Sequence, residues 1–240
     1  NFSSFTKKID DIYKKTLLCK EGTNANYIPQ LERVNPEQYG ISICTIDGQR
    51  YNIGDTDIDF SVQSCCKPIN YGIALEELGD EEVHKYVGRE PSGQSFNELL
   101  LNKGGLPHNP LINSGAIMTT SLIRKDNNLS DRFEYIMNKW SDLSGGIYKV
   151  GFNNSVYLSE KNTADRNFAL AYFKKEINNT KKIGFPESTN INETLDLYFQ
   201  SCSIEVNTQI LSIVASTLAN GGINPFTNKE GKKYATTHFL

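Results

Sequence analysis

The sequence predicts an α-rich α+β fold with one small antiparallel sheet. Helical periodicity dominates from about residue 64 onward, whereas a single hairpin pattern at residues 40–53 carries most of the strand signal. After residue 220 the chain offers a glycine-rich turn and a polar tail, which is too little strand material to complete a sheet. With 240 residues, 38% of them hydrophobic, the chain can form one large domain or two interlocked lobes.

The elements of the N-terminal third follow from local patterns. Apolar residues recur at roughly helical spacing over residues 5–19, with lysines and aspartates between them, and predict an amphipathic helix. Alternating residues on both sides of Asp47-Gly48 predict the hairpin, with that pair as its turn. A helix is then expected to begin near Ser64 and to end at Gly79.

The rest of the chain predicts a long loop followed by helices. Residues 90–113 lack periodicity and hold several glycines and prolines, and loops of this length in compact domains are often functional. Ser130 is the expected N-cap of one helix. Helices are expected at about 114–123, 130–143, 163–176, 192–203 and 207–219, and a short strand at 147–152.

Charge and cysteine content exclude several classes of protein. A net charge of −3 gives no electrostatic footprint for nucleic acid or a membrane surface, and no apolar run is long enough to span a bilayer. The five cysteines show no metal-binding spacing, and the vicinal pair Cys65-Cys66 suits reduced thiols. We therefore expect an intracellular, reducing compartment, with no metal, nucleic-acid or membrane partner.

The most informative stretch is the tetrad Ser64-Cys65-Cys66-Lys67. Positions i and i+3 share one face of a helix, so the Lys67 amine is expected beside the Ser64 hydroxyl. A lysine whose pKa is lowered by burial can act as the base that makes a serine nucleophilic. Ser and Lys are common residues, however, and the tetrad alone also fits an ordinary surface helix.

Further polar clusters gain meaning only as a set. Singly, each fits helix capping, turn chemistry or hydrogen bonding in the core. In order along the chain, the motifs are Tyr27-Ile28-Pro29-Gln30-Leu31, Ser61-Val62-Gln63-Ser64-x-x-Lys67-Pro68, Val83-His84-Lys85-Tyr86, Val87-Gly88-Arg89-Glu90-Pro91-Ser92-Gly93, His108-Asn109-Pro110 through Asn113-Ser114-Gly115-Ala116, Asp165-Arg166-Asn167 and Leu218-Ala219-Asn220-Gly221-Gly222. Together they resemble the serine-dependent glutaminases, most closely the kidney- and liver-type animal enzymes.

The resemblance implies hydrolysis of L-glutamine to L-glutamate and ammonia on a serine β-lactamase-like fold, with a helical lobe and an antiparallel sheet lobe. Ser64 would be the nucleophile that forms a γ-glutamyl ester, Lys67 its base, and the Ser64 N–H one oxyanion donor. The implied catalytic residues are Ser64, Lys67 and Tyr198, and the implied substrate-binding residues are Tyr27, Gln63, Asn113, Glu160, Asn167 and Tyr198.

The residue chemistry agrees with these roles. Free glutamine presents an α-ammonium group, for which Glu160 is the natural partner, and an α-carboxylate, to which Asn113 and Asn167 can donate. Tyr27 or Tyr198 could relay a proton to the leaving ammonia.

The resemblance also implies a setting for the enzyme. No metal or organic cofactor is implied, although phosphate or another anion can serve as an activator in such enzymes. The protein would be a homo-oligomer, a dimer of dimers, in the mitochondrial matrix or the cytoplasm. The loop from Phe96 to Leu106 is expected to gate the site, with Gly104 and Gly105 as its hinge, and the apolar run Leu99–Leu101 as a contact between subunits.

The chain departs from the family pattern at two places. In the family a further tyrosine and a Lys-Ser-Gly segment with the second oxyanion N–H follow the Asn220–Gly222 motif, and this sequence stops before them. We therefore expect residues 1–240 to be a catalytic domain without its C-terminal part, with lobes at 1–63 plus 190–240 (sheet) and 64–189 (helical). In the loop, Glu98 and Leu100 stand where a basic and an aromatic residue are usual.

Two other functions fit parts of the sequence. Penicillin-binding proteins and β-lactamases share S-x-x-K, but they also need a Lys-Thr-Gly motif, which this sequence lacks, and Glu160 suits a free amino acid better than a peptide. A non-catalytic binding fragment would fit the absence of the C-terminal segment. Cleavage of a chromogenic β-lactam tests the first function, and comparison of glutamine binding with glutamine turnover tests the second.

Overall fold

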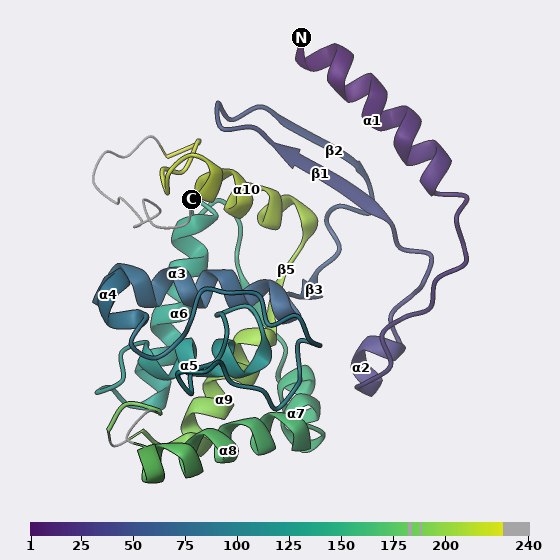
Figure 1. Ribbon diagram of the computed structural model, residues 1–240. Coiled ribbons are helices and arrows are strands. Elements are labelled where there is room, and N and C mark those ends of the chain that lie inside the picture. Colours follow the sequence, from purple (N-terminus) through teal and green to yellow (C-terminus); the bar gives the residue numbers. More distant parts are fainter. Residues whose placement is uncertain (182–183, 188, 228–240) are drawn as a thin grey trace.

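The computed structural model describes residues 1–181, 184–187 and 189–227. Most of its helices gather in one cluster, and the N-terminal helix, a β-hairpin and the last helix lie to one side of that cluster (Figure 1). Within the described residues, no helix is long and apolar enough to cross a membrane.

The hairpin is the predicted one. Strand β1 (Gly40–Cys44) pairs antiparallel with β2 (Arg50–Gly54), and Gly40 lies opposite Gly54. Gly48 takes the left-handed conformation in the turn, with φ of 83°, which glycine adopts at little cost. Helix α10 (Thr208–Ala219) packs against β1, and α1 (Phe2–Thr16) contacts β2. Two helices thus cover a sheet that would be marginal alone.

A second, three-stranded sheet was only partly predicted. Its order is β3 (Phe60–Ser61), β5 (Ile204–Val206) and β4 (Gly151–Phe152), all antiparallel. The strand expected at residues 147–152 is confined to its last two residues. The ladder continues past β3, because the Val62 N–H donates to the Ile204 carbonyl at 2.8 Å. It therefore fixes the segment that leads directly into Ser64.

The predicted helices are present with shifted ends. The helix expected at 130–143 is capped by Asn128, whose side chain accepts from the Asp131 N–H, and not by Ser130. An additional helix, α7, was not predicted. The helices of this part are η1 (Gln63–Cys65), α3 (Cys66–Leu78), α4 (Asp80–Val83), α5 (Asn113–Leu122), α6 (Leu129–Leu143), α7 (Asn154–Asn162), α8 (Asp165–Lys181) and α9 (Ile191–Cys202), and α2 (Pro29–Glu32) lies apart from them in the N-terminal segment.

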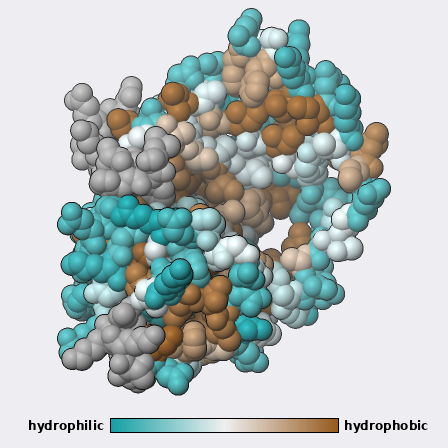
Figure 2. Space-filling model, viewed as in Figure 1, coloured by the Kyte–Doolittle hydropathy of each residue, from teal (hydrophilic) through white to brown (hydrophobic). Residues whose placement is uncertain are grey.

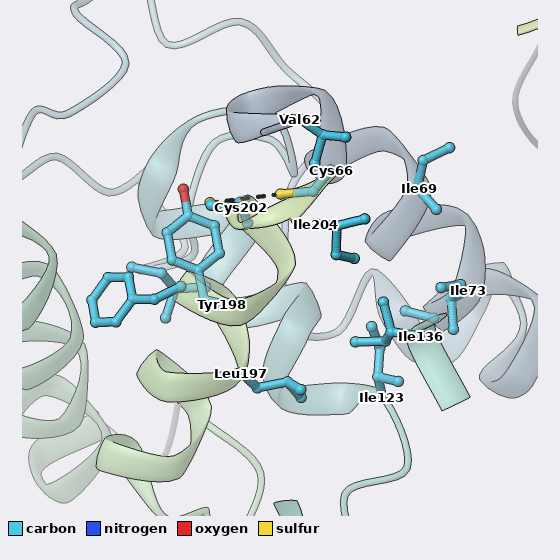
Figure 3. Packing of buried hydrophobic residues seen from close by; sticks show 14 of the residues in the cluster. Val62, Cys66, Ile69, Ile73, Ile123, Ile136, Leu197, Tyr198, Cys202 and Ile204 are labelled. Atoms are coloured by element: carbon cyan, nitrogen blue, oxygen red, sulfur yellow. Dashed lines mark hydrogen bonds between the residues drawn. The ribbon is translucent and has the colours of Figure 1, made fainter. Parts of the chain in front are cut away.

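The core forms where α3, α5, α6 and α9 meet. Ile73, Ile136 and Leu197 come from three of these helices and pack together (Figure 3). Helix α9 contacts α5, α6, α7 and α8, so it belongs to the helical part. The division into a sheet lobe at residues 1–63 plus 190–240 and a helical lobe at residues 64–189 stays a prediction. Residues 228–240 of that expected lobe lie outside the described residues.

Gly115 allows the start of α5 to lie against the preceding loop. A Cβ atom at this position would lie 1.8 Å from the backbone oxygen of Asn109. Helix propensity alone favours alanine over glycine by about 1 kcal/mol. The steric conflict has the opposite sign and is the larger effect, since overpacking of this kind typically costs about 1–3 kcal/mol.

We therefore expect Gly115→Ala to lower the free energy of unfolding by up to about 2 kcal/mol in urea denaturation, which is the steric cost less the gain in helix propensity. Ser114→Ala is the matched control. The Ser114 hydroxyl is buried and has no partner among the described residues, so its removal should leave stability unchanged or slightly higher. A stabilising effect of Gly115→Ala would show that the loop yields to α5.

Candidate active site

Ser64 lies in the single turn η1, between the small sheet and α3. Gln63, directly before it, has a positive φ of 48°, a conformation that costs a non-glycine residue roughly 1–2 kcal/mol. Contacts of the Gln63 side chain hold this turn. Its Oε1 accepts from the Tyr27 hydroxyl at 2.9 Å, and its Nε2 donates to Ser61 Oγ at 3.1 Å. The strained residue thus links the N-terminal segment to the start of α3.

Lys67 lies one turn further along and is 4% exposed. Its Nζ donates to Asn113 Oδ1 at 2.7 Å, and Asn113 Nδ2 donates in turn to Asn167 Oδ1 at 3.1 Å. Burial lowers the pKa of the Lys67 ammonium, since a low-dielectric surrounding disfavours the charged form. The structure therefore joins α3, α5 and α8 through one polar chain whose first member is a lysine disposed to lose its proton.

A cavity of about 370 Å³ opens over this chain. Seven of the eight predicted site residues line it, and Lys67 reaches it through Asn113. The seven come from segments far apart in the sequence: Tyr27, Gln63, Ser64, Asn113, Glu160, Asn167 and Tyr198. Six further lining residues were not among the predicted site residues, namely Phe96, Asn97, Thr163, Ala164, Arg166 and Cys202. Of these, Arg166 lies within the quoted Asp165-Arg166-Asn167 motif.

Glu160 is the carboxylate of the cavity. It lies on α7 and is 9% exposed, and its Oε1 atom has no hydrogen-bond partner in the described part of the chain. Burial raises the pKa of Glu160 to about 7, and the neighbouring Gln63 amide offsets part of that rise. A buried carboxylate with one unpartnered oxygen is stabilised strongly by a cationic hydrogen-bond donor placed against it.

The two tyrosines of the cavity stay neutral at physiological pH. Burial raises the pKa of the Tyr27 phenol, with a contribution from Glu160, and burial also raises the pKa of the Tyr198 phenol. Each hydroxyl can therefore donate a hydrogen bond or pass on a proton. Tyr198 stands on α9 one turn before Cys202, whose sulfur lies 3.7 Å from the sulfur of Cys66 (Figure 3).

A larger cavity of about 690 Å³ lies beside α2 and β3, and none of the predicted site residues lines it. Volume is therefore a poor guide to the active site here. Within the described residues, no group of three or more His, Cys, Asp or Glu side chains could hold a metal ion. The smaller cavity is lined by residues with hydroxyl, phenol, amide and thiol groups, one carboxylate and the Arg166 guanidinium, and the Lys67 amine reaches it through Asn113.

Comparisons with known proteins agree on one family. The family model described as Glutaminase matches residues 22–238. Putative glutaminase 2 of Caenorhabditis elegans is 46% identical over 230 residues, which are 95% of this chain and 37% of that protein. The mitochondrial liver isoform of glutaminase from Rattus norvegicus is 44% identical over 229 residues, 95% of this chain and 37% of its own length. The chain thus spans little more than a third of these animal relatives.

Solved structures confirm the fold class. The probable glutaminase ybaS superimposes with a TM-score of 0.87 at 32% identity, over 98% of this chain and 73% of that one. Native Mglu gives a TM-score of 0.83 at 29% identity, over 94% of this chain and 53% of that one. The fold is therefore the predicted serine β-lactamase-like one, helical with small antiparallel sheets.

Burial of Glu160 has a consequence for stability. Its pKa of about 7 in the folded chain exceeds the ordinary value of 4.5, so folding favours the protonated acid. The stabilising contribution of that acid is complete below pH 4.5 and is lost as the pH rises through 7. Glu160→Gln, which mimics the acid, should raise the free energy of unfolding at about pH 8.5 by up to about 3 kcal/mol.

At about pH 4.5 the same substitution should change stability little. Urea denaturation at the two pH values measures the difference. Glu134→Gln, at an exposed position of α6, is the control and should have little effect at either pH. Equal effects of Glu160→Gln at both pH values would contradict burial as the cause.

Proposed function

The chain belongs to the glutaminase family, and from this membership we propose that the protein hydrolyses L-glutamine to L-glutamate and ammonia through a γ-glutamyl ester on Ser64. The observation that carries the proposal is the gathering of Ser64, Glu160 and the amides of Asn113 and Asn167 around one cavity, with Lys67 bound to Asn113. A nucleophile, its base and groups for both charged ends of a free amino acid are thus available together.

In the proposed reaction, Lys67 removes the proton of the Ser64 hydroxyl as its oxygen attacks the side-chain carbonyl carbon of glutamine. The lowered pKa of Lys67 favours the neutral amine that this step requires. The negative charge on the carbonyl oxygen is met by the Ser64 N–H. A proton passes to the amide nitrogen, ammonia leaves, and water then hydrolyses the ester to glutamate and free Ser64.

For the substrate, we propose that the α-ammonium group pairs with Glu160 and that the α-carboxylate accepts from Asn113 and Asn167. The unpartnered Oε1 of Glu160 supports the first contact. One N–H of Asn113 is already used on Asn167, which leaves its second N–H and the Asn167 amide for the carboxylate. Tyr198, neutral in its buried position, is proposed to carry the proton to the leaving group.

The setting of the enzyme is part of the same proposal. We propose a homotetramer, a dimer of dimers, in which the exposed Leu99 and Leu100 of the loop contact another subunit; they are 40% and 41% exposed.

Similarity to the mitochondrial liver isoform supports a mitochondrial location, which fractionation of source cells tests. The proposed step needs no metal or organic cofactor, and dialysis against a chelator with and without phosphate tests this together with anion activation.

Ser64→Ala should lower the turnover of glutamine by at least about 10⁴-fold, because no other group forms the ester. Lys67→Ala should come close to the same loss, because an unassisted serine is a poor nucleophile. Release of ammonia by the purified variants measures both. Cys65→Ser, an exposed neighbour between the two, is the control and should retain most of the activity. Substantial turnover by Ser64→Ala would exclude Ser64 as the nucleophile.

N-acetyl-glutamine should be a poor substrate, with a kcat/KM on the order of 10²-fold or more below that of glutamine. Acetylation removes the ammonium group and would leave Glu160 buried beside an amide, at a cost of about 2–5 kcal/mol. Asparagine should also fail, since its amide is one methylene shorter. Similar efficiencies for glutamine and N-acetyl-glutamine would remove Glu160 from its proposed role.

Leu100→Asp should weaken assembly and activity together, because it places a charge in the proposed contact between subunits. Light scattering gives the oligomeric state and ammonia release gives the rate. Leu18→Asp, on an exposed leucine outside the loop, is the matched control and should change neither. If Leu100→Asp leaves the oligomeric state and the rate as they were, the loop is an ordinary connector.

A further inference from the structure

Lys174 is a second buried lysine, and it lies outside the cavity. It stands on α8 with an exposed fraction of 3%, and its Nζ donates to the backbone carbonyl of Gly105 at 2.5 Å. Lysines are rarely buried this far unless a partner holds them. Burial also lowers the pKa of the Lys174 ammonium to about 8, so the group remains mostly charged at neutral pH.

The position of Lys174 on α8 links it to the site. Asn167 precedes it by seven residues, which is two helical turns, so both residues lie on one face. Leu170 and Ala171 lie between them on the same face and are buried. An apolar residue would continue this stripe, and a lysine there costs desolvation. One face of α8 thus contacts α5 through Asn167 and the long loop through Lys174.

The loop presents a hydrogen-bonded turn to Lys174, at the two glycines that were expected to act as a hinge. Asn102 organises this turn: its N–H donates to the Leu106 carbonyl at 2.8 Å, and its carbonyl accepts from the Gly105 N–H at 2.8 Å. Its side-chain oxygen accepts from the N–H groups of Gly104 and Leu106 at 2.9 and 3.0 Å. Gly105 has a positive φ of 79°, which turns its carbonyl outward at little cost.

The N-terminal end of the same loop lies over the reacting groups. The carbonyl of Phe96 accepts from the Asn113 N–H at 2.9 Å, and Phe96 and Asn97 line the cavity. The Phe96 ring centroid lies 5.7 Å from Lys67 Nζ. The loop crosses the front of α5 in Figure 1, and Figure 2 shows hydrophobic side chains exposed on this part of the surface. Two attachments, at Asn113 and at Lys174, therefore bound the segment that covers the cavity.

We propose that Lys174 is a positioning residue for the proposed hydrolysis: its buried ammonium anchors the turn at residues 102–106 to α8, and this anchor holds Phe96 and Asn97 over the cavity. The inference rests on the proposed function only for its kinetic consequence. With the anchor in place, movement of residues 96–101 takes place between two fixed points. Without it, the loop stays attached at Phe96 and at Pro107, whose carbonyl accepts from the Gly88 N–H at 2.8 Å, and the stretch between these two points is free to leave α8.

The experiment compares Lys174→Met with Lys175→Met in the purified protein. Methionine matches the length of lysine but cannot donate, and Lys175 is the adjacent exposed lysine of the same helix. For Lys174→Met we expect the amides of Asn102 and Leu106 to exchange their hydrogens at least roughly tenfold faster, because the turn opens more often. We also expect KM for glutamine to rise about three- to tenfold with kcat changed less, since the chemical groups are untouched.

The melting temperature distinguishes a positioning role of Lys174 from a purely structural one. Lys174→Met removes the desolvation of a buried cation, so the melting temperature should stay constant or rise, whereas a purely structural lysine would lower it. Asn102→Ala is a second test variant, because it removes the side-chain hydrogen bonds that close the turn within the loop. It should give the same fast exchange, and the double variant should be little worse than either single one.

If the amide hydrogens of Asn102 and Leu106 exchange at the same rate in Lys174→Met as in the unaltered protein, Lys174 does not anchor the turn. The same conclusion follows if the effects of Lys174→Met and Asn102→Ala are fully additive in the double variant. A lowered melting temperature with uniform exchange across the chain would reduce Lys174 to a structural residue. Hydrogen exchange needs no turnover, so the anchor can fail or hold separately from the proposed hydrolysis, which Ser64→Ala tests.

Discussion

Burial of the Lys67 ammonium is the constraint on which the site depends. An amine in water keeps its proton far above neutral pH, so a lysine can serve as a base only where its surroundings disfavour the charged form, and burial does so here. The apolar packing of α3 against α5, and of α5 against α9, supplies that surrounding. The partner of Lys67 is the amide oxygen of Asn113 and not a carboxylate. An amide accepts the hydrogen bond without adding the negative charge that would raise the pKa again.

The same burial acts in the opposite direction on the acid of the cavity. Glu160 lies close to half-protonated at neutral pH, and the phenols of Tyr27 and Tyr198 are neutral. The negative charge of the cavity is therefore incomplete at neutral pH, and a cation placed beside Glu160 would favour its full ionisation. A free amino acid brings such a cation together with its own carboxylate, so binding adds no net charge to a poorly solvated space. Groups whose pKa values are displaced by environment in this way are typical of acid–base sites.

The elements that the sequence predicted correctly are those whose pattern and pairing lie within a short stretch of chain. The hairpin around Gly48 was predicted because its turn and its alternating strands lie within fifteen residues. The strands β3, β4 and β5 have two or three residues each, too few to show a period, and their pairing joins residues far apart in sequence. The cap of α6 was misplaced by two residues because Asn128 and Ser130 are both good caps, and only the structure shows which side chain meets the Asp131 N–H.

Similar reasons limit what the sequence says of the site. Resemblance to the glutaminases named the polar residues, and the chain brings seven of those eight to one cavity. Phe96 and Asn97 belong to the loop that was expected to gate the site, but they were not named as site residues, because neither period nor spacing shows which side chains of an aperiodic loop point inward. Lys174 was missed for the converse reason, since a lysine in a helical pattern is normally taken as a surface residue, and its burial depends on a carbonyl 69 positions away in sequence.

Burial has different consequences at the two lysines, Lys67 and Lys174. Both ammonium groups are disfavoured by burial, but their acceptors differ in kind. The acceptor of Lys67 is a side-chain amide at the cavity, which can exchange its partners when a ligand arrives. The acceptor of Lys174 is the backbone carbonyl of Gly105, in a turn closed by four hydrogen bonds that involve Asn102. Desolvation makes the first lysine ready to give up its proton, whereas at the second it makes the bond to the carbonyl strong, because a charged donor without water has no alternative partner.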